Sequence, residues 1–144
     1  MVDSKTSDDM HEAIELLYLS YRAFTDRADK LLEKRGLNRA HHRILYFVGR
    51  NPGGSVADLL ECLAISKQAL HTPLKQLMAM GLINSQRSMD DARVKMLRLS
   101  ASGRRLESRL TDAQSTLLNH VFEQSGPAAE QSWRAVMRHL SNSA

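Results

Sequence analysis

The amino-acid sequence predicts a mainly α-helical protein with one small β-hairpin. Apolar residues recur at steps of three and four along most of the 144 residues, which is the spacing of amphipathic helices. Only the stretch after Gly81 changes to short apolar runs around a polar tip, as a hairpin does. Aromatic residues make up 5% of the chain, with seven glycines and three prolines, which argues against a many-stranded, turn-rich β fold.

The first predicted helix spans residues 8–35 and is too long for a small domain. Asp8 and Asp9 suit its N-terminal end, and Gly36 can cap its C-terminal end. At about 1.5 Å per residue the helix measures roughly 40 Å, so we expect it to pack partly against a second chain. Its apolar stripe consists of Met10, Ile14, Leu17, Tyr21, Phe24, Ala28 and Leu31.

Three shorter helices are predicted next. The second helix runs over about 38–49, and the Pro- and Gly-containing run 51–54 then breaks the chain. Two short helices over 56–63 and 66–80 follow, joined by only two residues, and Ser66 is a good N-cap for the second of them. Two helices joined this tightly are typical of a helix-turn-helix.

A hairpin and two more helices complete the chain. Strands over 82–88 and 93–99 flank the polar tip, and four apolar residues in the second strand leave its inward face open. Ser100 caps a long helix, and Gly126-Pro127 ends it and starts the last helix. The apolar stripes of these two helices are Leu106, Leu110, Ala113, Leu117 and Val121, then Trp133, Val136, Met137 and Leu140.

This order of elements predicts a winged helix-turn-helix, a fold that places its second helix in the DNA major groove. We assign residues 38–100 to the DNA-binding domain, and 8–35 with 101–144 to a helical dimerisation region. The charge supports this assignment, because residues 38–110 hold twelve Lys and Arg against five Asp and Glu. A basic segment inside an otherwise balanced chain is the electrostatic pattern of a polyanion partner.

The predicted second helix of the motif has a polar, basic face without any acidic residue. If Leu70, Leu74 and Leu77 face the core, Gln68, Thr72 and Lys75 point away from it, with His71 and Gln76 on the flanks. Gln can pair with adenine, Thr can meet a thymine methyl, and Lys can reach guanine or phosphate. The predicted contacts from this helix to double-stranded DNA are Ser66, Lys67, Gln68, His71, Thr72, Lys75 and Gln76.

The predicted hairpin concentrates cations, with Arg87 on one strand and Arg93 and Lys95 on the other. An arginine near the tip can enter a narrow minor groove, where the potential is most negative. Asp91 is placed to brace Arg93 by a charge-assisted hydrogen bond. We therefore add Arg87, Arg93 and Lys95 to the DNA contacts and assign Asp91 to wing bracing.

The stretch SKQALHTPLKQLMAMGLI and the basic hairpin DDARVKMLRLSASGR resemble the MarR (multiple antibiotic resistance regulator) family of bacterial transcription factors. The match includes Asp91, Arg93, Ser100 and Gly103 and covers residues 8–140. The resemblance implies a homodimer with interlocked terminal helices and one winged domain on each half-site of a palindromic operator. It also implies a repressor that a small phenolic or aromatic carboxylate effector releases from DNA.

Two residues depart from the family pattern. Pro73 lies inside the recognition helix, where it removes the amide bond to the Ala69 carbonyl, at about 3 kcal/mol in a straight helix. We expect a kink there. Ala92 stands at the wing tip where many members have a charged residue, which predicts a weaker grip on DNA.

An effector pocket implied by the family lies between the first two helices and the winged domain. Tyr18, Arg22, His41 and His42 are the nearby residues that offer an aromatic wall and a cation for a carboxylate. Ordinary core and interface roles for these four residues stay open.

Oxidant and zinc sensing are alternatives to an organic effector. Cys62 lies beside Leu63 in the helix 56–63, and we predict that it is a small buried core residue. His41 and His42 are adjacent and point to different sides of a helix, and no His-x-x-x-His spacing occurs, so we predict no metal site.

Other functional classes have less support. The sequence lacks a Gly-rich phosphate loop, G-x-S-x-G and H-E-x-x-H, so we predict neither an enzyme nor a bound cofactor. A winged-helix module that binds only another protein remains an alternative. The polar, acidic N-terminus, the single cysteine and the absence of a long apolar run predict a cytoplasmic protein without a membrane partner.

Overall fold

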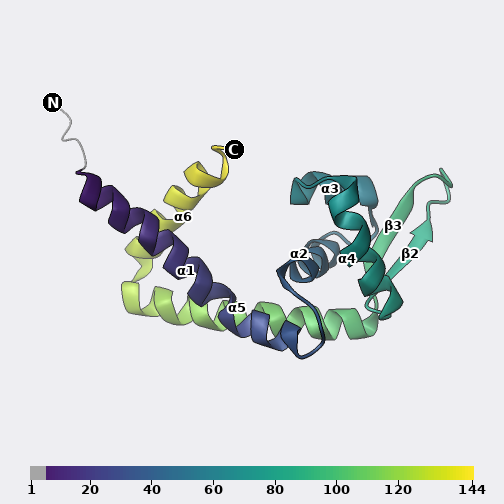
Figure 1. The fold of residues 1–144 in the computed structure, drawn as a ribbon, viewed down its shortest axis with the longest axis horizontal. Helices are drawn as coiled ribbons and strands as arrows, with labels where there is room; N and C mark the ends of the chain where they lie inside the picture. Colours follow the sequence, from purple (N-terminus) through teal and green to yellow (C-terminus); the bar gives the residue numbers. More distant parts are fainter. Residues whose placement is uncertain (1–5) are drawn as a thin grey trace. The chain divides into compact units, whose positions relative to one another are not determined.

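The computed structural model describes residues 6–144, in which six helices and a three-stranded sheet follow one another (Figure 1). The chain forms two compact units. The first, which we call the winged unit, is Arg27–Asp112, and the second, the terminal unit, contains the described residues up to Asp26 and Ala113–Ala144. Helices α1 (Ser7–Glu33) and α5 (Ala101–Ser125) contribute to both units. The predicted mainly α-helical fold with a small hairpin is confirmed.

Helix α2 (Arg39–Arg50) begins at a capping box. The side chain of Asn38 accepts a hydrogen bond from the Ala40 amide at 2.9 Å, and the Asn38 amide donates to Nδ1 of His41 at 3.0 Å. These bonds satisfy amides that the first helical turn leaves without partners. The buried residues of α2 are His41, His42, Ile44, Leu45 and Val48.

Helices α3 (Val56–Leu63) and α4 (Lys67–Ala79) form the helix-turn-helix. Ser55 and Asp58 cap α3 reciprocally, and Oγ of Ser66 accepts from the Ala69 amide at 3.0 Å at the start of α4. Because such caps depend on residues close in the chain, the two helices begin and end within one residue of the bounds predicted from the sequence.

The sheet contains β2 (Ile83–Arg87), β3 (Lys95–Leu99) and a third, very short strand, β1 (Gly54–Ser55). All pairs are antiparallel, and β3 lies between the other two. Leu97 and Leu99 are buried, which identifies the inward face of β3. β1 was not predicted, because two residues are too few to show an alternating pattern.

The start of α5 is fastened to the turn between α4 and β2. Oγ of Ser100 donates to the Gly81 carbonyl at 2.6 Å and accepts from the Gly103 amide at 3.0 Å. A Cβ at Gly103 would lie 2.0 Å from the carbonyl oxygen of Leu82, so this close approach requires glycine. The predicted cap at Ser100 is therefore present.

The winged unit contains the whole hydrophobic core of the described chain. The core joins the end of α1, α2, α3, α4, the sheet and the first half of α5 (Figure 1). Its sixteen buried apolar residues are Ala28, Leu32, Leu37, Ile44, Leu45, Val48, Leu59, Leu70, Leu74, Leu77, Leu82, Ile83, Leu97, Leu99, Leu106 and Leu110.

The terminal unit differs, because none of its described apolar residues is buried. Helix α6 (Pro127–Ser141) contacts α5 through Phe122 and Trp133, whose ring centroids are 5.2 Å apart. The exposed large apolar residues of this unit are Met10, Ile14, Leu16, Leu17, Tyr18, Leu19, Tyr21, Val121, Trp133, Val136 and Leu140.

Among the described residues, no helix combines the length and the apolar character needed to cross a membrane.

Candidate nucleic-acid interface

Helix α4 has one buried apolar side and one exposed polar side. Leu70, Leu74 and Leu77 are 1%, 8% and 0% exposed and attach the helix to the core. The side chains on the other side come from a stretch without Asp or Glu, so they present hydrogen-bonding groups and positive charge to solvent. Every residue of this segment that the sequence predicts to contact DNA is exposed: Ser66, Lys67, Gln68, His71, Thr72, Lys75 and Gln76.

Ser66, just before α4, and Pro73, inside it, each have a role in the structure of the helix itself. The hydroxyl of Ser66 already accepts a hydrogen bond from the Ala69 amide as the N-cap. Pro73 is half-buried inside the helix, which continues through it to Ala79. Because proline has no amide hydrogen, the Ala69 carbonyl lacks its usual helical donor at this turn.

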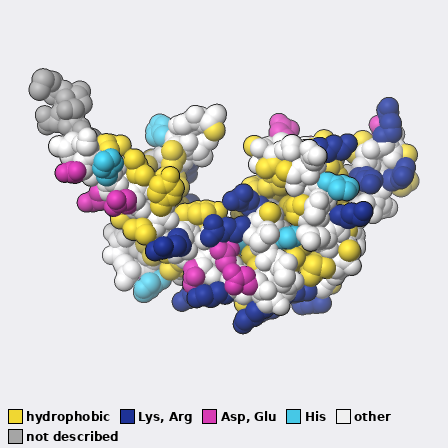
Figure 2. Space-filling model, viewed as in Figure 1, with side chains coloured by type: hydrophobic (Ala, Val, Ile, Leu, Met, Phe, Trp, Pro, Cys, Tyr) yellow, Lys and Arg dark blue, Asp and Glu magenta, His cyan; other side chains and the backbone are white. Residues whose placement is uncertain are grey.

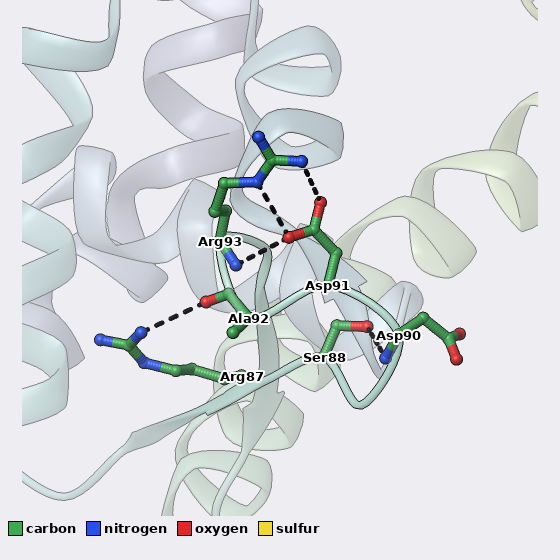
Figure 3. A network of polar contacts seen from close by, with 6 residues as sticks. All are labelled: Arg87, Ser88, Asp90, Asp91, Ala92 and Arg93. Carbon is green, nitrogen blue, oxygen red and sulfur yellow. Dashed lines mark hydrogen bonds and ion pairs between the residues drawn. The ribbon is translucent and has the colours of Figure 1, made fainter.

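The wing is the hairpin formed by β2 and β3 (83–99). At its tip the carboxylate of Asp91 holds the side chain of Arg93 (Figure 3). Nε and Nη2 of Arg93 donate to the two carboxylate oxygens of Asp91, both at 3.1 Å, and the Arg93 amide donates to Oδ1 at 3.0 Å. The side-chain hydrogen bonds from Arg93, followed by the backbone bond, hold the pKa of Asp91 below its ordinary value of 3.8. The hydrogen bond predicted between these two residues is present.

Arg87 is held across the same hairpin. Its Nη1 donates to the Ala92 carbonyl at 3.3 Å (Figure 3). In the β2–β3 register Arg87 lies directly opposite Lys95, so two cations face each other on neighbouring strands. Like charges in directly opposed positions destabilise an isolated sheet. A polyanion bound at the wing would attract both cations, so that their closeness would favour binding instead of opposing the sheet.

A groove lies between α4 and the wing. Its rim contains cations from both elements, Lys67 and Lys75 on α4 with Arg93 and Lys95 on the wing side, and His71 of α4 lies beside them. Figure 2 shows these types of side chain, dark blue and cyan, over α4 and the hairpin. The structure therefore brings together predicted contact residues that are up to 28 positions apart in the sequence. Apolar residues form its floor: Val56, Leu70, Leu74, Met78 and Leu97.

The two histidines considered for an effector site are both buried in α2, at 4% and 8% exposure. His41 uses both ring nitrogens: Nδ1 accepts from the Asn38 amide, and Nε2 lies 2.7 Å from Oε1 of Gln76 on α4. Burial lowers the pKa of His42 below its ordinary value of 6.5, although the negative charges of Glu107 and Asp29 partly oppose this shift. The contact between His41 and Gln76 was not predicted, because no local pattern links residues 35 positions apart.

The other two effector candidates belong to the terminal unit. Tyr18 and Arg22 lie on α1, and both are exposed, Tyr18 at 74%. His41 and His42 belong to the winged unit. The four candidates are therefore divided between the two units.

The prediction that Cys62 is buried in the core is wrong, because its side chain is exposed. The face of α3 that packs inward consists of Leu59, which is buried, and the half-buried Val56, Leu60 and Leu63. At 100° per residue, Cys62 lies about 110° from the centre of that face. Its neighbour in the sequence, Leu63, is on the packed side, and adjacency along a helix does not place two residues on one face.

No group of three or more His, Cys, Asp or Glu that could hold a metal ion occurs among residues 6–144.

Comparison with known proteins identifies relatives of the whole chain. A family model described as MarR family matches residues 35–94. The HTH-type transcriptional regulator PetP of Rhodobacter capsulatus is 32% identical over 139 residues, which cover 96% of this chain and 84% of PetP.

Two solved structures have the same fold. A MepR mutant of S. aureus bound to an oligodeoxyribonucleotide is 18% identical with a TM-score of 0.64, covering 91% of this chain and 96% of that one. NadR in complex with 4-hydroxyphenylacetate is 17% identical with a TM-score of 0.74, covering 100% of this chain and 99% of that one.

Proposed function

This chain belongs to the MarR family of helix-turn-helix transcriptional regulators, and from that premise we propose that it is a homodimeric repressor. Each protomer binds one half-site of a palindromic operator, and a small aromatic acid releases the dimer from DNA. The observation that carries the proposal is the groove rimmed by cations from both α4 and the wing. Such a surface suits the phosphate backbone and base edges of duplex DNA.

In the proposed complex α4 enters the major groove and reads bases. Gln68 and Thr72 lie on its exposed side and have the groups that recognise adenine and the thymine methyl. Lys67 and Lys75 supply positive charge for phosphate or guanine, and Ser66 and His71 lie at the start and on the flank of this surface.

The wing is proposed to follow the adjacent minor groove. Asp91 holds the guanidinium of Arg93 in one orientation, which reduces the side-chain entropy lost on binding. Arg87 and Lys95, opposite each other on β2 and β3, would lie against phosphates.

A second copy of the chain is the proposed cover for the terminal unit. Eleven large apolar residues of α1, α5 and α6 are exposed there, and the described part of this unit has no buried apolar side chain. An apolar surface of this extent on a soluble protein marks an interaction site. A twofold dimer would present two copies of α4, with half-site centres about one helical turn apart.

An aromatic carboxylate is the proposed effector class. NadR, which shares this fold, is in complex with 4-hydroxyphenylacetate, a compound of that class. In this chain Tyr18, Arg22, His41 and His42 are the candidate residues, with Arg22 as the cation for the carboxylate. His41 could accept a new partner only by giving up its bond to Gln76.

Selection of bound sequences from a pool of random duplexes tests the proposal directly. We expect a palindromic consensus whose half-sites are about one helical turn apart. We also expect the affinity to fall steeply as salt rises, because Lys and Arg displace counterions from phosphates. A consensus without twofold symmetry, a monomer at micromolar concentration, or affinity that does not respond to salt would contradict it.

Gln68→Ala then tests base reading by α4. The variant should lose roughly 1–3 kcal/mol on the selected duplex and much less on a random duplex of the same length. Thr72→Ala should behave in the same way. An equal loss on both duplexes would show that Gln68 contacts the backbone instead of a base.

A further inference from the structure

We propose that His41 is a positioning residue for DNA binding, because it fixes which atoms Gln76 presents to the DNA. This inference rests on the proposed function, since it concerns how the recognition helix meets DNA. It connects a buried histidine of α2, considered above for effector binding, with an exposed glutamine of α4.

The hydrogen bonds of His41 determine its tautomer. A backbone amide can only donate, so Nδ1 of His41, 3.0 Å from the Asn38 amide nitrogen, must be the acceptor. The neutral ring then carries its hydrogen on Nε2. That hydrogen faces the side chain of Gln76 at 2.7 Å. The bond runs from Nε2 of His41 to an oxygen, which must be Oε1 of Gln76.

This assignment orients the whole amide of Gln76. Its oxygen is directed at α2 and is used by His41, so the amide NH₂ group is the part that can reach another molecule. Bidentate pairing with adenine needs both the oxygen and the NH₂ of a glutamine. With its oxygen turned toward α2, Gln76 does not present both groups to one adenine while it keeps the bond to His41. It instead donates to an acceptor on DNA, which is a phosphate oxygen or an acceptor on a base edge.

The position of Gln76 after Pro73 gives this bond a second effect. Pro73 removes one hydrogen bond from α4, so the residues after it are held less firmly by the helix itself. Leu77 attaches that part of α4 to the core by apolar contact, and the His41–Gln76 bond adds a directional contact to α2. Loss of the bond frees the Gln76 amide to rotate on its exposed side.

Gln68 provides an internal comparison on the same helix. It is exposed, and no hydrogen bond from its side chain occurs within the described chain. Both ends of its amide are free to pair with a base. The two glutamines of α4 should therefore respond differently to substitutions at His41.

Two substitutions at position 41 separate its two hydrogen bonds. In His41→Asn the side-chain oxygen can replace Nδ1 as acceptor for the Asn38 amide, but the side chain is too short to reach Gln76. In His41→Gln the amide nitrogen lies near the position of Nε2 and can still donate to Gln76. A melting temperature of His41→Asn equal to that of Gln76→Ala, which removes the same bond to α2, shows that the helix cap is intact.

Affinity is measured on the duplex that the wild-type protein selects from a random pool. We expect His41→Asn and Gln76→Ala each to weaken binding by about two- to tenfold, and His41→Gln to bind within about twofold of wild type. The double variant His41→Asn with Gln76→Ala should bind no more weakly than Gln76→Ala alone, because each change removes the same interaction. His41→Asn with Gln68→Ala should show the product of the two single effects.

Three outcomes would overturn the positioning role. These are an unchanged affinity in His41→Asn, a loss in His41→Gln as large as in His41→Asn, and independent effects of His41→Asn and Gln76→Ala. The last would indicate that His41 acts on fold stability alone. A random duplex distinguishes the acceptor: equal losses there for Gln76→Ala indicate phosphate, and losses confined to the selected duplex indicate a base.

Failure of the proposed function gives a different result. The tautomer of His41 can be read from its ring nitrogen shifts by NMR without DNA, and we expect hydrogen on Nε2. A wild-type protein that shows this tautomer but selects no duplex contradicts the proposed function. A protein that selects a duplex but carries the hydrogen on Nδ1 contradicts the positioning of Gln76.

Discussion

The winged unit and the terminal unit differ in how far their apolar side chains are exposed. In Arg27–Asp112 sixteen apolar residues are buried and form one core, to which every helix of the unit and the strands β2 and β3 contribute. The helices of the terminal unit also carry apolar stripes, but none of their described apolar side chains is buried, and eleven large ones are 41–74% exposed. The amphipathic pattern is the same in both units, so the difference lies in whether this chain supplies the opposite surface.

This contrast has a thermodynamic consequence. Burial of apolar area is the main favourable term in folding. In the winged unit this favourable free energy comes from residues of the same chain. In the terminal unit it has to come from contact with another surface. If the proposed second copy supplies that surface, the winged unit should be stable in one chain and the order of the terminal unit should depend on dimerisation.

Removal of a core side chain in the winged unit is expected to have the largest effect. Leu77 is 0% exposed. Leu77→Ala should lower the free energy of unfolding by about 2–5 kcal/mol. Urea denaturation followed by circular dichroism measures the loss. Lys75→Ala, on the exposed side of the same helix, is the control and should stay within about 0.5 kcal/mol of wild type.

A charge on the apolar surface of the terminal unit is expected to have the next largest effect. Leu17→Glu and Val136→Glu place a carboxylate on residues that are 48% and 62% exposed in one chain. Each should weaken the proposed dimer by about 2–4 kcal/mol, which sedimentation at several protein concentrations measures.

Ile65→Glu is the matched control for dimerisation. Ile65 is 37% exposed, but it lies in the turn between α3 and α4 of the winged unit. We expect its dimer to be as stable as that of wild type. If Ile65→Glu dissociates the dimer and Leu17→Glu does not, the assignment of the interface to the terminal unit is wrong.

A substitution at the tip of the wing should weaken DNA binding without changing the fold of either unit. Arg93→Ala should weaken binding to the selected duplex by about tenfold, about 1.4 kcal/mol, with unchanged dimerisation and melting temperature. The tip is exposed and contributes little to the core.

Asp91→Ala distinguishes bracing from simple electrostatics. Removal of a negative charge near DNA should strengthen binding if charge alone matters. Loss of the two side-chain hydrogen bonds to Arg93 should weaken binding if Asp91 acts as a brace, by less than Arg93→Ala does. Tighter binding of Asp91→Ala at the same salt concentration would show that Asp91 does not brace Arg93 and serves only to form the turn.

The smallest expected effect is a pH dependence of the winged unit. His42 has a pKa lowered from 6.5 by burial, so the unfolded chain binds a proton at His42 more readily than the folded one. Stability is therefore full above about pH 6.5 and declines as the pH falls below that value. His42→Gln should remove this part of the slope, and an identical slope in wild type and variant would contradict it.

The elements of the winged unit illustrate how far local pattern reaches. The bounds of α3 and α4 follow from Ser55, Ser66 and the apolar spacing, all of which act within four residues. The exposed side of α4 and the Asp91–Arg93 pair were predictable for the same reason, since both depend on near neighbours. The DNA contacts assigned to these residues remain predictions.

What the sequence determined by itself is therefore the local structure: the helices, their caps, the hairpin, the basic middle segment and the family resemblance. Only the tertiary structure decided that β1 pairs with β3, that Cys62 is exposed and that His41 meets Gln76. Each of these depends on which surfaces distant segments bring together. Helical and strand periods define the direction of a side chain around its own element, but the partner on that side is set by the packing of the whole chain.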